Sequence, residues 1–163
     1  MPSAYPMHPK FRLRRYWRKK LGGQLPVLNL PTGKPRPPKL TYRGARLRFD
    51  LSNAKAIKGI ATQEKTTLYT VLLAGFMAVL HRLTGQEDLI VGSPMGCRAQ
   101  SEVEKVVGYF INAVAMRATI DPNMSFKLLM DQVRQTIIEA MAHQYVLTPC
   151  ILVPSANRRA TAG

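Results

Sequence analysis

Large apolar residues from Leu68 to Leu83 are so closely spaced that they predict a helix with hydrophobic side chains on nearly every side. Thr66 or Thr67 is placed to cap this helix, and Gly85 is placed to end it. A second long helix is predicted after Ser125, where apolar residues recur at steps of three and four. These residues are Phe126, Leu129, Met130, Val133, Ile137 and Met141. The first helix should therefore be buried on several sides, and the second should pack one face on a sheet.

Three shorter runs have the character of strands. Ile111 to Thr119 predicts a core strand, and Leu89 to Val91 predicts a short central strand. Gly92-Ser93-Pro94 should turn the chain directly afterwards, since glycine and proline favour turns. Arg46 to Leu51 alternates polar and apolar residues, which predicts a half-buried strand.

Two further helices flank these strands. One should follow Ser52-Asn53, which can cap it, and run as far as Lys65. The other covers Phe11 to Leu21, where the apolar positions fall at helical spacing and the cations between them face outward. These apolar positions are Leu13, Tyr16, Trp17 and Leu21. Strands that alternate with helices indicate an α/β fold.

The organisation along the chain follows from these elements. Residues 1–42 form a lead-in, made of the basic helix and an extended crossing rich in proline, which cannot sustain a helix. Residues 43–145 form the folded lobe. Beyond Val146 the pattern fades, and residues 146–163 are predicted to be a disordered tail. A chain of 163 residues is long enough for one core.

The net charge of +15 is concentrated at one end. Residues 1–49 hold thirteen lysines and arginines and no acidic residue. Such a segment could contact an acidic protein, nucleic acid or anionic lipid, because clustered cations attract polyanions. The simpler interpretation is a solvated helix face. The candidate contact residues are Arg14, Arg15, Arg18 and Lys19.

Cofactor and localisation signals are few. The two cysteines, Cys97 and Cys150, form no CxxC pair and have no histidine cluster beside them, so no metal site is predicted. The longest apolar stretch, Val71 to Leu80, is too short to span a bilayer, and no export signal is recognisable. We therefore expect a soluble protein in the reducing cytoplasm.

One polar residue interrupts the predicted core strand. Asn112 occupies a position where a simple core would have another hydrophobe. Alternation along a strand predicts that Phe110 and Asn112 share one face, whereas Tyr109 and Ile111 share the other. A buried amide must find hydrogen-bond partners, so Asn112 either ties two backbone segments together or faces a ligand.

Several motifs occur together in a recognisable order. An apolar helix containing Leu72-Leu73-Ala74-Gly75-Phe76 precedes an RxTGQxDxxVGxPxxxR pattern from Arg82 to Arg98, and a VGxFxNxxxxR pattern follows from Val107 to Arg117. A YWxxxLxxxxP segment from Tyr16 to Pro26 comes before them. This order resembles the C-terminal lobe of a nonribosomal peptide synthetase condensation domain, a member of the chloramphenicol-acetyltransferase-like superfamily. The resemblance extends from about Tyr16 to Gln144.

The resemblance implies a fold and an activity. One chloramphenicol-acetyltransferase-like lobe is expected, with a mixed sheet and packed helices. Intact condensation domains join carrier-bound aminoacyl thioesters by a peptide bond, using an HHxxxDG motif in their N-terminal lobe. His8, His81 and His143 are each isolated from such a motif. No catalytic residue is therefore assigned, and enzymatic activity of the chain alone is left open.

The resemblance also suggests roles for four residues. Asn112 would line the substrate tunnel or support its wall, and Phe110 would face the same tunnel or simply pack. Arg98 would be a structural arginine at the lobe junction. Arg117 would be a surface or interface cation rather than a reactive group.

Partners follow from the same resemblance. Substrates would arrive on phosphopantetheine arms, so the chain would bind no cofactor itself. Its partners would be peptidyl carrier protein domains and the missing N-terminal lobe, rather than nucleic acid or membrane. The first hypothesis is a fragment of a condensation domain, inactive alone. The alternatives are a carrier-binding half-domain and a polyanion binder that uses the basic helix. A hydrolase built on Ser93 and His143 is disfavoured, because no GxSxG elbow is present.

Overall fold

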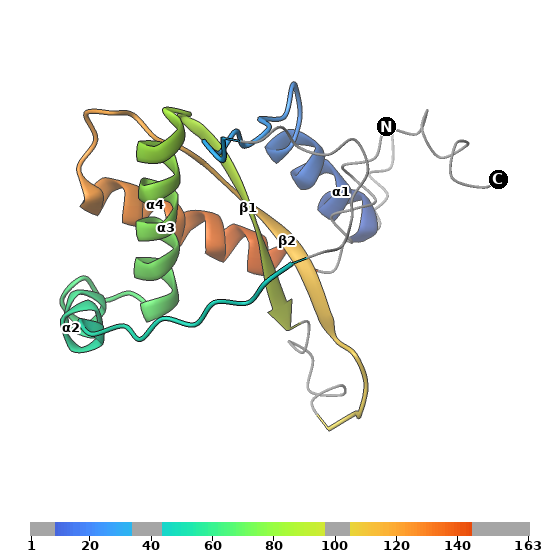
Figure 1. Ribbon diagram of the computed structural model, residues 1–163. Helices are drawn as coiled ribbons and strands as arrows, with labels where there is room; N and C mark the ends of the chain where they lie inside the picture. Colours follow the sequence, from blue (N-terminus) through green and yellow to red (C-terminus); the bar gives the residue numbers. More distant parts are fainter. Residues whose placement is uncertain (1–8, 34–43, 97–104, 145–163) are drawn as a thin grey trace, which may run out of the picture.

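The structure is a computed structural model that describes residues 9–33, 44–96 and 105–144. Three helices are followed by two strands and a fourth helix in these segments, and Figure 1 shows their arrangement. The elements are α1 (Pro9–Lys20), α2 (Ala54–Gln63), α3 (Leu68–Thr84), β1 (Asp88–Gly96), β2 (Ile111–Thr119) and α4 (Phe126–Ala142). The α/β fold class is therefore confirmed.

The two strands form an antiparallel pair in the middle of the molecule. Their register runs from Asp88 opposite Thr119 to Gly96 opposite Ile111. Strand β2 has the predicted bounds, but the predicted turn at residues 92–94 is wrong, because β1 continues through Pro94. No described strand lies on the other edge of β1, and a proline is tolerated at such an edge since its missing amide need not donate to a neighbour.

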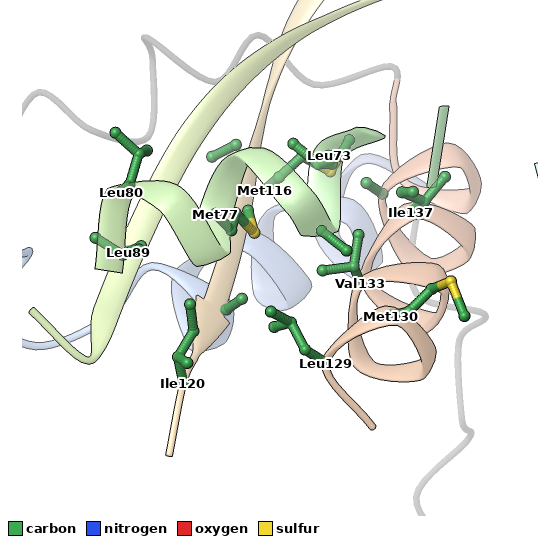
Figure 2. Packing of buried hydrophobic residues seen from close by; sticks show 14 of the residues in the cluster. Leu73, Met77, Leu80, Leu89, Met116, Ile120, Leu129, Met130, Val133 and Ile137 are labelled. Carbon is green, nitrogen blue, oxygen red and sulfur yellow. The ribbon is translucent and has the colours of Figure 1, made fainter. Parts of the chain in front are cut away.

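Helices lie on both sides of this pair. In Figure 1 α3 lies to the left of the strands and α1 to the right, and α4 passes behind α3 towards the strand pair. Residues from all the main elements meet in one hydrophobic core, part of which is shown in Figure 2. Its labelled members are Leu73, Met77, Leu80, Leu89, Met116, Ile120, Leu129, Met130, Val133 and Ile137.

Helix α1 belongs to the same core. Trp17 is completely buried and Leu21 nearly so, whereas Arg18 and Lys19 between them face outward, as the spacing predicts. The indole Nε1 of Trp17 donates a hydrogen bond to the carbonyl of His143 at 2.9 Å. The basic lead-in is thus anchored to the far end of α4. The domain boundary at residue 42 stays a prediction.

Local capping explains where the long helices begin and end. The Thr67 side chain accepts a hydrogen bond from the Thr70 amide, and Gly85 ends α3 in the left-handed conformation with φ of 69°. Ser125 caps α4 by accepting from the Leu128 amide. These three predictions are confirmed. The predicted cap of α2 is wrong, because the Asn53 side chain makes no capping hydrogen bond.

The strand predicted from Arg46 to Leu51 is absent. Residues 44–50 form no strand, and Leu47 and Phe49 are 77% and 84% exposed. Alternating residues form a strand only when another strand accepts their backbone hydrogen bonds, and no described strand pairs with this segment.

Helix α3 is less buried than its composition predicts. One face packs into the core, but five large apolar residues on the opposite face are exposed: Tyr69, Leu72, Phe76, Val79 and Leu83. We call these five residues the α3 stripe. They are separated by alternating steps of three and four residues, so they form one continuous surface along the helix.

No single helix among the described residues is long and apolar enough to cross a bilayer, although α2 and α3 together, bent by 109°, reach the required length and composition. The predicted tail, 146–163, lies outside the described residues.

Candidate functional site

Asn112 lies near the start of β2 and is 8% exposed. Its side-chain nitrogen Nδ2 donates a hydrogen bond of 2.6 Å to the backbone carbonyl of Gln144, which follows the end of α4. This contact matches the structural alternative, in which the amide ties two backbone segments together. Asn112 therefore fixes the end of α4 against the strand pair.

The neighbours of Asn112 follow the predicted alternation. Val114 lies on the same buried face, whereas Ile111 and Tyr109 are exposed. Phe110 directly precedes β2 and is half-buried. Asn112 is thus on the buried face of β2, and Phe110 lies just before the start of that strand. Their role in a tunnel stays a prediction.

Ser93 and His143 do not form a catalytic pair. The Ser93 hydroxyl is buried on β1 and lies 2.5 Å from the hydroxyl of Tyr69. The His143 ring nitrogen Nδ1 lies 2.7 Å from the carbonyl of Glu139, one turn earlier in α4. Each side chain has a partner other than the one that a catalytic pair requires, so the geometry gives no support to a hydrolase.

Arg117 links three parts of the fold. Its Nε and Nη2 atoms donate to the two carboxylate oxygens of Asp88 at 2.9 and 2.6 Å, and Nη1 donates to the carbonyls of Lys20 and Gly22 at 3.0 and 3.3 Å. The hydrogen bonds to Asp88 raise the pKa of Arg117 above its ordinary value. Arg117, predicted to be a surface or interface cation, is half-buried and acts as a clamp that joins β2, β1 and the end of α1.

A second polar cluster joins α1 to α4. The Tyr16 hydroxyl donates to Oε2 of Glu139 at 3.1 Å, and Lys20 lies 3.5 Å from the same oxygen. The Tyr16 ring stacks on His143 with centroids 3.9 Å apart. Burial, together with the negative charge of Glu139, raises the pKa of Tyr16.

The carboxylate of this cluster is held in its charged form. Burial by itself would raise the pKa of Glu139, but the hydrogen bond from Gln135 and the charge of Lys20 outweigh burial and lower that pKa. The cluster is consequently an ionic and aromatic contact between two helices.

The basic residues of α1 form an exposed surface. Arg14, Arg15, Arg18 and Lys19 all face solvent. No described acidic residue forms an ion pair with any of these four. We call these four residues the α1 basic face. Arg98, the predicted lobe-junction residue, lies outside the described residues.

Sequence reasoning missed the partners of the most connected residues. It noted Arg117 and Asp88 as separate motif positions, but the register brings them to diagonal positions across the strand pair. The motif positions indicated that each residue has a role, but only the strand register shows that the two residues pair. The contacts of Tyr16 with Glu139 and His143 span more than 120 residues and carried no local signal.

A family model described as the condensation domain matches residues 9–160. This match continues beyond Gln144, so the predicted end of the resemblance was too early.

Two curated relatives illustrate the similarity in sequence. Phosphinothricin tripeptide synthetase PhsB of Streptomyces viridochromogenes is 47% identical over 131 residues, which are 79% of this chain and 11% of that protein. A linear gramicidin synthase protein of Brevibacillus parabrevis is 41% identical over 133 residues, which are 80% of this chain and 3% of that protein. The chain therefore spans only a small part of these relatives.

Solved structures show the same fold. A four-domain nonribosomal peptide synthetase has a TM-score of 0.80 at 23% identity, covering 88% of this chain and 11% of that one. The first condensation domain of the CDA synthetase has a TM-score of 0.68 at 23% identity, covering 82% of this chain and 29% of that one. The described helices and strands therefore have the arrangement found within these larger chains.

Proposed function

Because the chain belongs to the condensation-domain family, we propose that it works as one lobe of such a domain and takes part in joining carrier-bound aminoacyl thioesters through a peptide bond. The family match over residues 9–160 carries this proposal. In the reaction the amine of one substrate attacks the thioester carbonyl of the other. A C–N bond forms, the C–S bond breaks, and the carrier thiol leaves with a proton.

The lobe described here would supply structure rather than the reacting groups. The histidine that orients or deprotonates the amine belongs to the HHxxxDG motif, which this sequence lacks. Asn112 would shape the tunnel wall by holding Gln144 against β2, and Phe110 would extend the same face. Arg98 would contact the other lobe.

The α3 stripe supports the need for a second part. Monomeric proteins seldom expose a continuous apolar surface of this kind without a partner. The chain covers 29% of the CDA synthetase condensation domain chain that it resembles. The remaining part of a condensation domain would cover the α3 stripe, and the isolated chain would associate with itself or with other proteins instead.

The α1 basic face would receive the carrier protein. Its four cations suit an acidic carrier surface, and the phosphopantetheine arm would reach the tunnel from there. Family membership favours this partner over nucleic acid or a membrane surface. A cytoplasmic location would follow, since carrier domains and their loading enzymes act there.

One experiment tests the function directly. The chain would be fused behind the N-terminal lobe of a condensation domain from PhsB, a relative that is 47% identical to this chain over the matched region. The fusion would then be supplied with two loaded carrier domains. Dipeptide on the downstream carrier is the expected product, and an Asn112→Ala variant should form it more slowly. Arg134→Ala, which changes an exposed residue of α4, is the matched control. A correctly folded fusion without product would contradict the proposal.

Carrier binding has its own test. Reversing the charge of Arg14 and Arg15 should weaken binding of an acidic carrier protein by about tenfold or more, an effect that shrinks as salt rises. Reversal at Arg134, an exposed cation on α4, should leave binding unchanged. Equal losses in both variants would show that only the net charge matters.

A further inference from the structure

A pocket lies on the side of the molecule where α1 meets β2 and α4. Its volume is about 560 Å³, which falls within the range of small-molecule sites. The residues that define its chemistry are Lys19, Lys20, Arg117, Gln132, Thr136 and Glu139. The pocket is therefore lined by three elements, α1, β2 and α4, that are far apart in the sequence.

The charges around this pocket favour an anion. Lys19, Lys20 and Arg117 line it, against the single carboxylate of Glu139. Arg117 is already occupied by Asp88, and Lys20 is close to Glu139. Lys19 forms no ion pair with a described acidic residue, so its charge remains available to a ligand.

The same pocket contains a buried hydrogen-bond acceptor that has no donor among the described residues. The side-chain oxygen Oε1 of Gln132 is buried and accepts no hydrogen bond from the described residues. Leaving such an atom unpaired costs about 1–3 kcal/mol, so proteins seldom retain one without a partner. Thr136 lies one turn further along α4, also lines the pocket and is itself buried.

We propose that this pocket binds a small phosphate monoester that also carries a hydroxyl group. Lys19 holds the phosphate, because a lysine ammonium group binds phosphate as a point charge, and Lys20, which also pairs with Glu139, adds to the positive potential. The ligand hydroxyl donates to Oε1 of Gln132. This site is distinct from the α1 basic face, to which it contributes only Lys19, and it does not depend on the proposed condensation function.

The simpler explanation is that a water molecule fills the place beside Gln132 and that any anion is attracted by the net charge of +15. The two explanations differ in selectivity. Non-specific attraction treats all anions of equal charge alike and ignores Gln132. A built site prefers a ligand that offers both the phosphate and the donor.

The test is a titration of the full chain followed by two-dimensional NMR. The probes are glycerol 3-phosphate, which has both groups, sulfate, which has only charge, and glycerol, which has only hydroxyl groups. We expect saturable shifts at Gln132 and Thr136 with glycerol 3-phosphate, and affinity for sulfate weaker by about tenfold, corresponding to the loss of the hydrogen bond between the ligand hydroxyl and Gln132.

Two variants complete the test. Gln132→Leu removes the buried acceptor without leaving a polar group unpaired, so it should fold at least as stably as the parent while binding glycerol 3-phosphate about tenfold more weakly. Arg14→Gln, which changes a cation outside the pocket, should bind like the parent. Thermal unfolding of each variant establishes that it is folded before the titration.

Three results would overturn the proposal. The first is equal affinity for sulfate and glycerol 3-phosphate. The second is a Gln132→Leu variant that is folded and binds like the parent. The third is a set of shifts confined to Arg14, Arg15 and Arg18, which would place the anion on the outer face of α1.

Discussion

Asn112 and the carbonyl of Gln144 are joined by a hydrogen bond of 2.6 Å across 32 residues of sequence. The contact is buried, so neither group can form a hydrogen bond with water instead when the other is removed. This one amide therefore couples the start of β2 to the end of α4.

Replacing Asn112 by Ala should lower the free energy of unfolding by about 1–3 kcal/mol, because the Gln144 carbonyl loses a buried donor. Chemical denaturation measures this change. Asn112→Asp should cost at least as much, since a carboxylate would face a carbonyl oxygen. If the alanine variant is as stable as the parent, the hydrogen bond does not support the fold.

Arg117→Lys should be destabilising although the charge is kept. Lysine cannot make the two parallel hydrogen bonds to Asp88 together with those to the α1 carbonyls, and a loss of about 1–3 kcal/mol is expected. Arg134→Lys is the matched control, because Arg134 and Asp131 form an exposed pair on one helix worth about 0.5 kcal/mol or less. Similar losses in both variants would argue against the clamp.

The helix caps offer a comparison within one molecule. Thr67→Ala and Ser125→Ala each remove a side chain that accepts from a helix amide, and each should cost about 1 kcal/mol. Asn53→Ala removes no such hydrogen bond and should change stability by only a few tenths of a kcal/mol. An equal cost at Asn53 would mean that its side chain caps α2 in solution.

The contact between Tyr16 and Glu139 predicts a pH dependence at both ends of the scale. The pKa of Glu139 is lowered from 4.5, so its contribution is present above that value and is lost as the pH falls through the folded pKa. The pKa of Tyr16 is raised from 10.0, so its contribution is present below that value and is lost as the pH rises through the folded pKa.

Tyr16→Phe provides the measurement for this dependence. The variant keeps a ring to stack on His143 but cannot donate to Glu139. Its difference in unfolding free energy from the parent should be largest near neutral pH and should shrink in strong acid and in strong base. A difference that is constant with pH would show that the hydrogen bond contributes nothing that titrates.

Much of the local structure follows from the sequence itself. The bounds of β2, the caps at Thr67 and Ser125 and the end of α3 at Gly85 were all predicted, because each depends on residues within a few positions of one another. The buried face of α1 around Trp17 was predicted for the same reason. The order of motifs also identified the family correctly.

What depended on distant partners could be decided only by the tertiary structure. Strand β1 continues through Pro94 because β2 pairs with it there. Residues 46–51 form no strand because no described strand pairs with them. Arg117 joins the two strands because the register places Asp88 beside it. Asn112 joins β2 to α4 because α4 ends next to its side chain. Side-chain pattern sets which face of an element is apolar. Only the packing of the whole chain determines what that face meets.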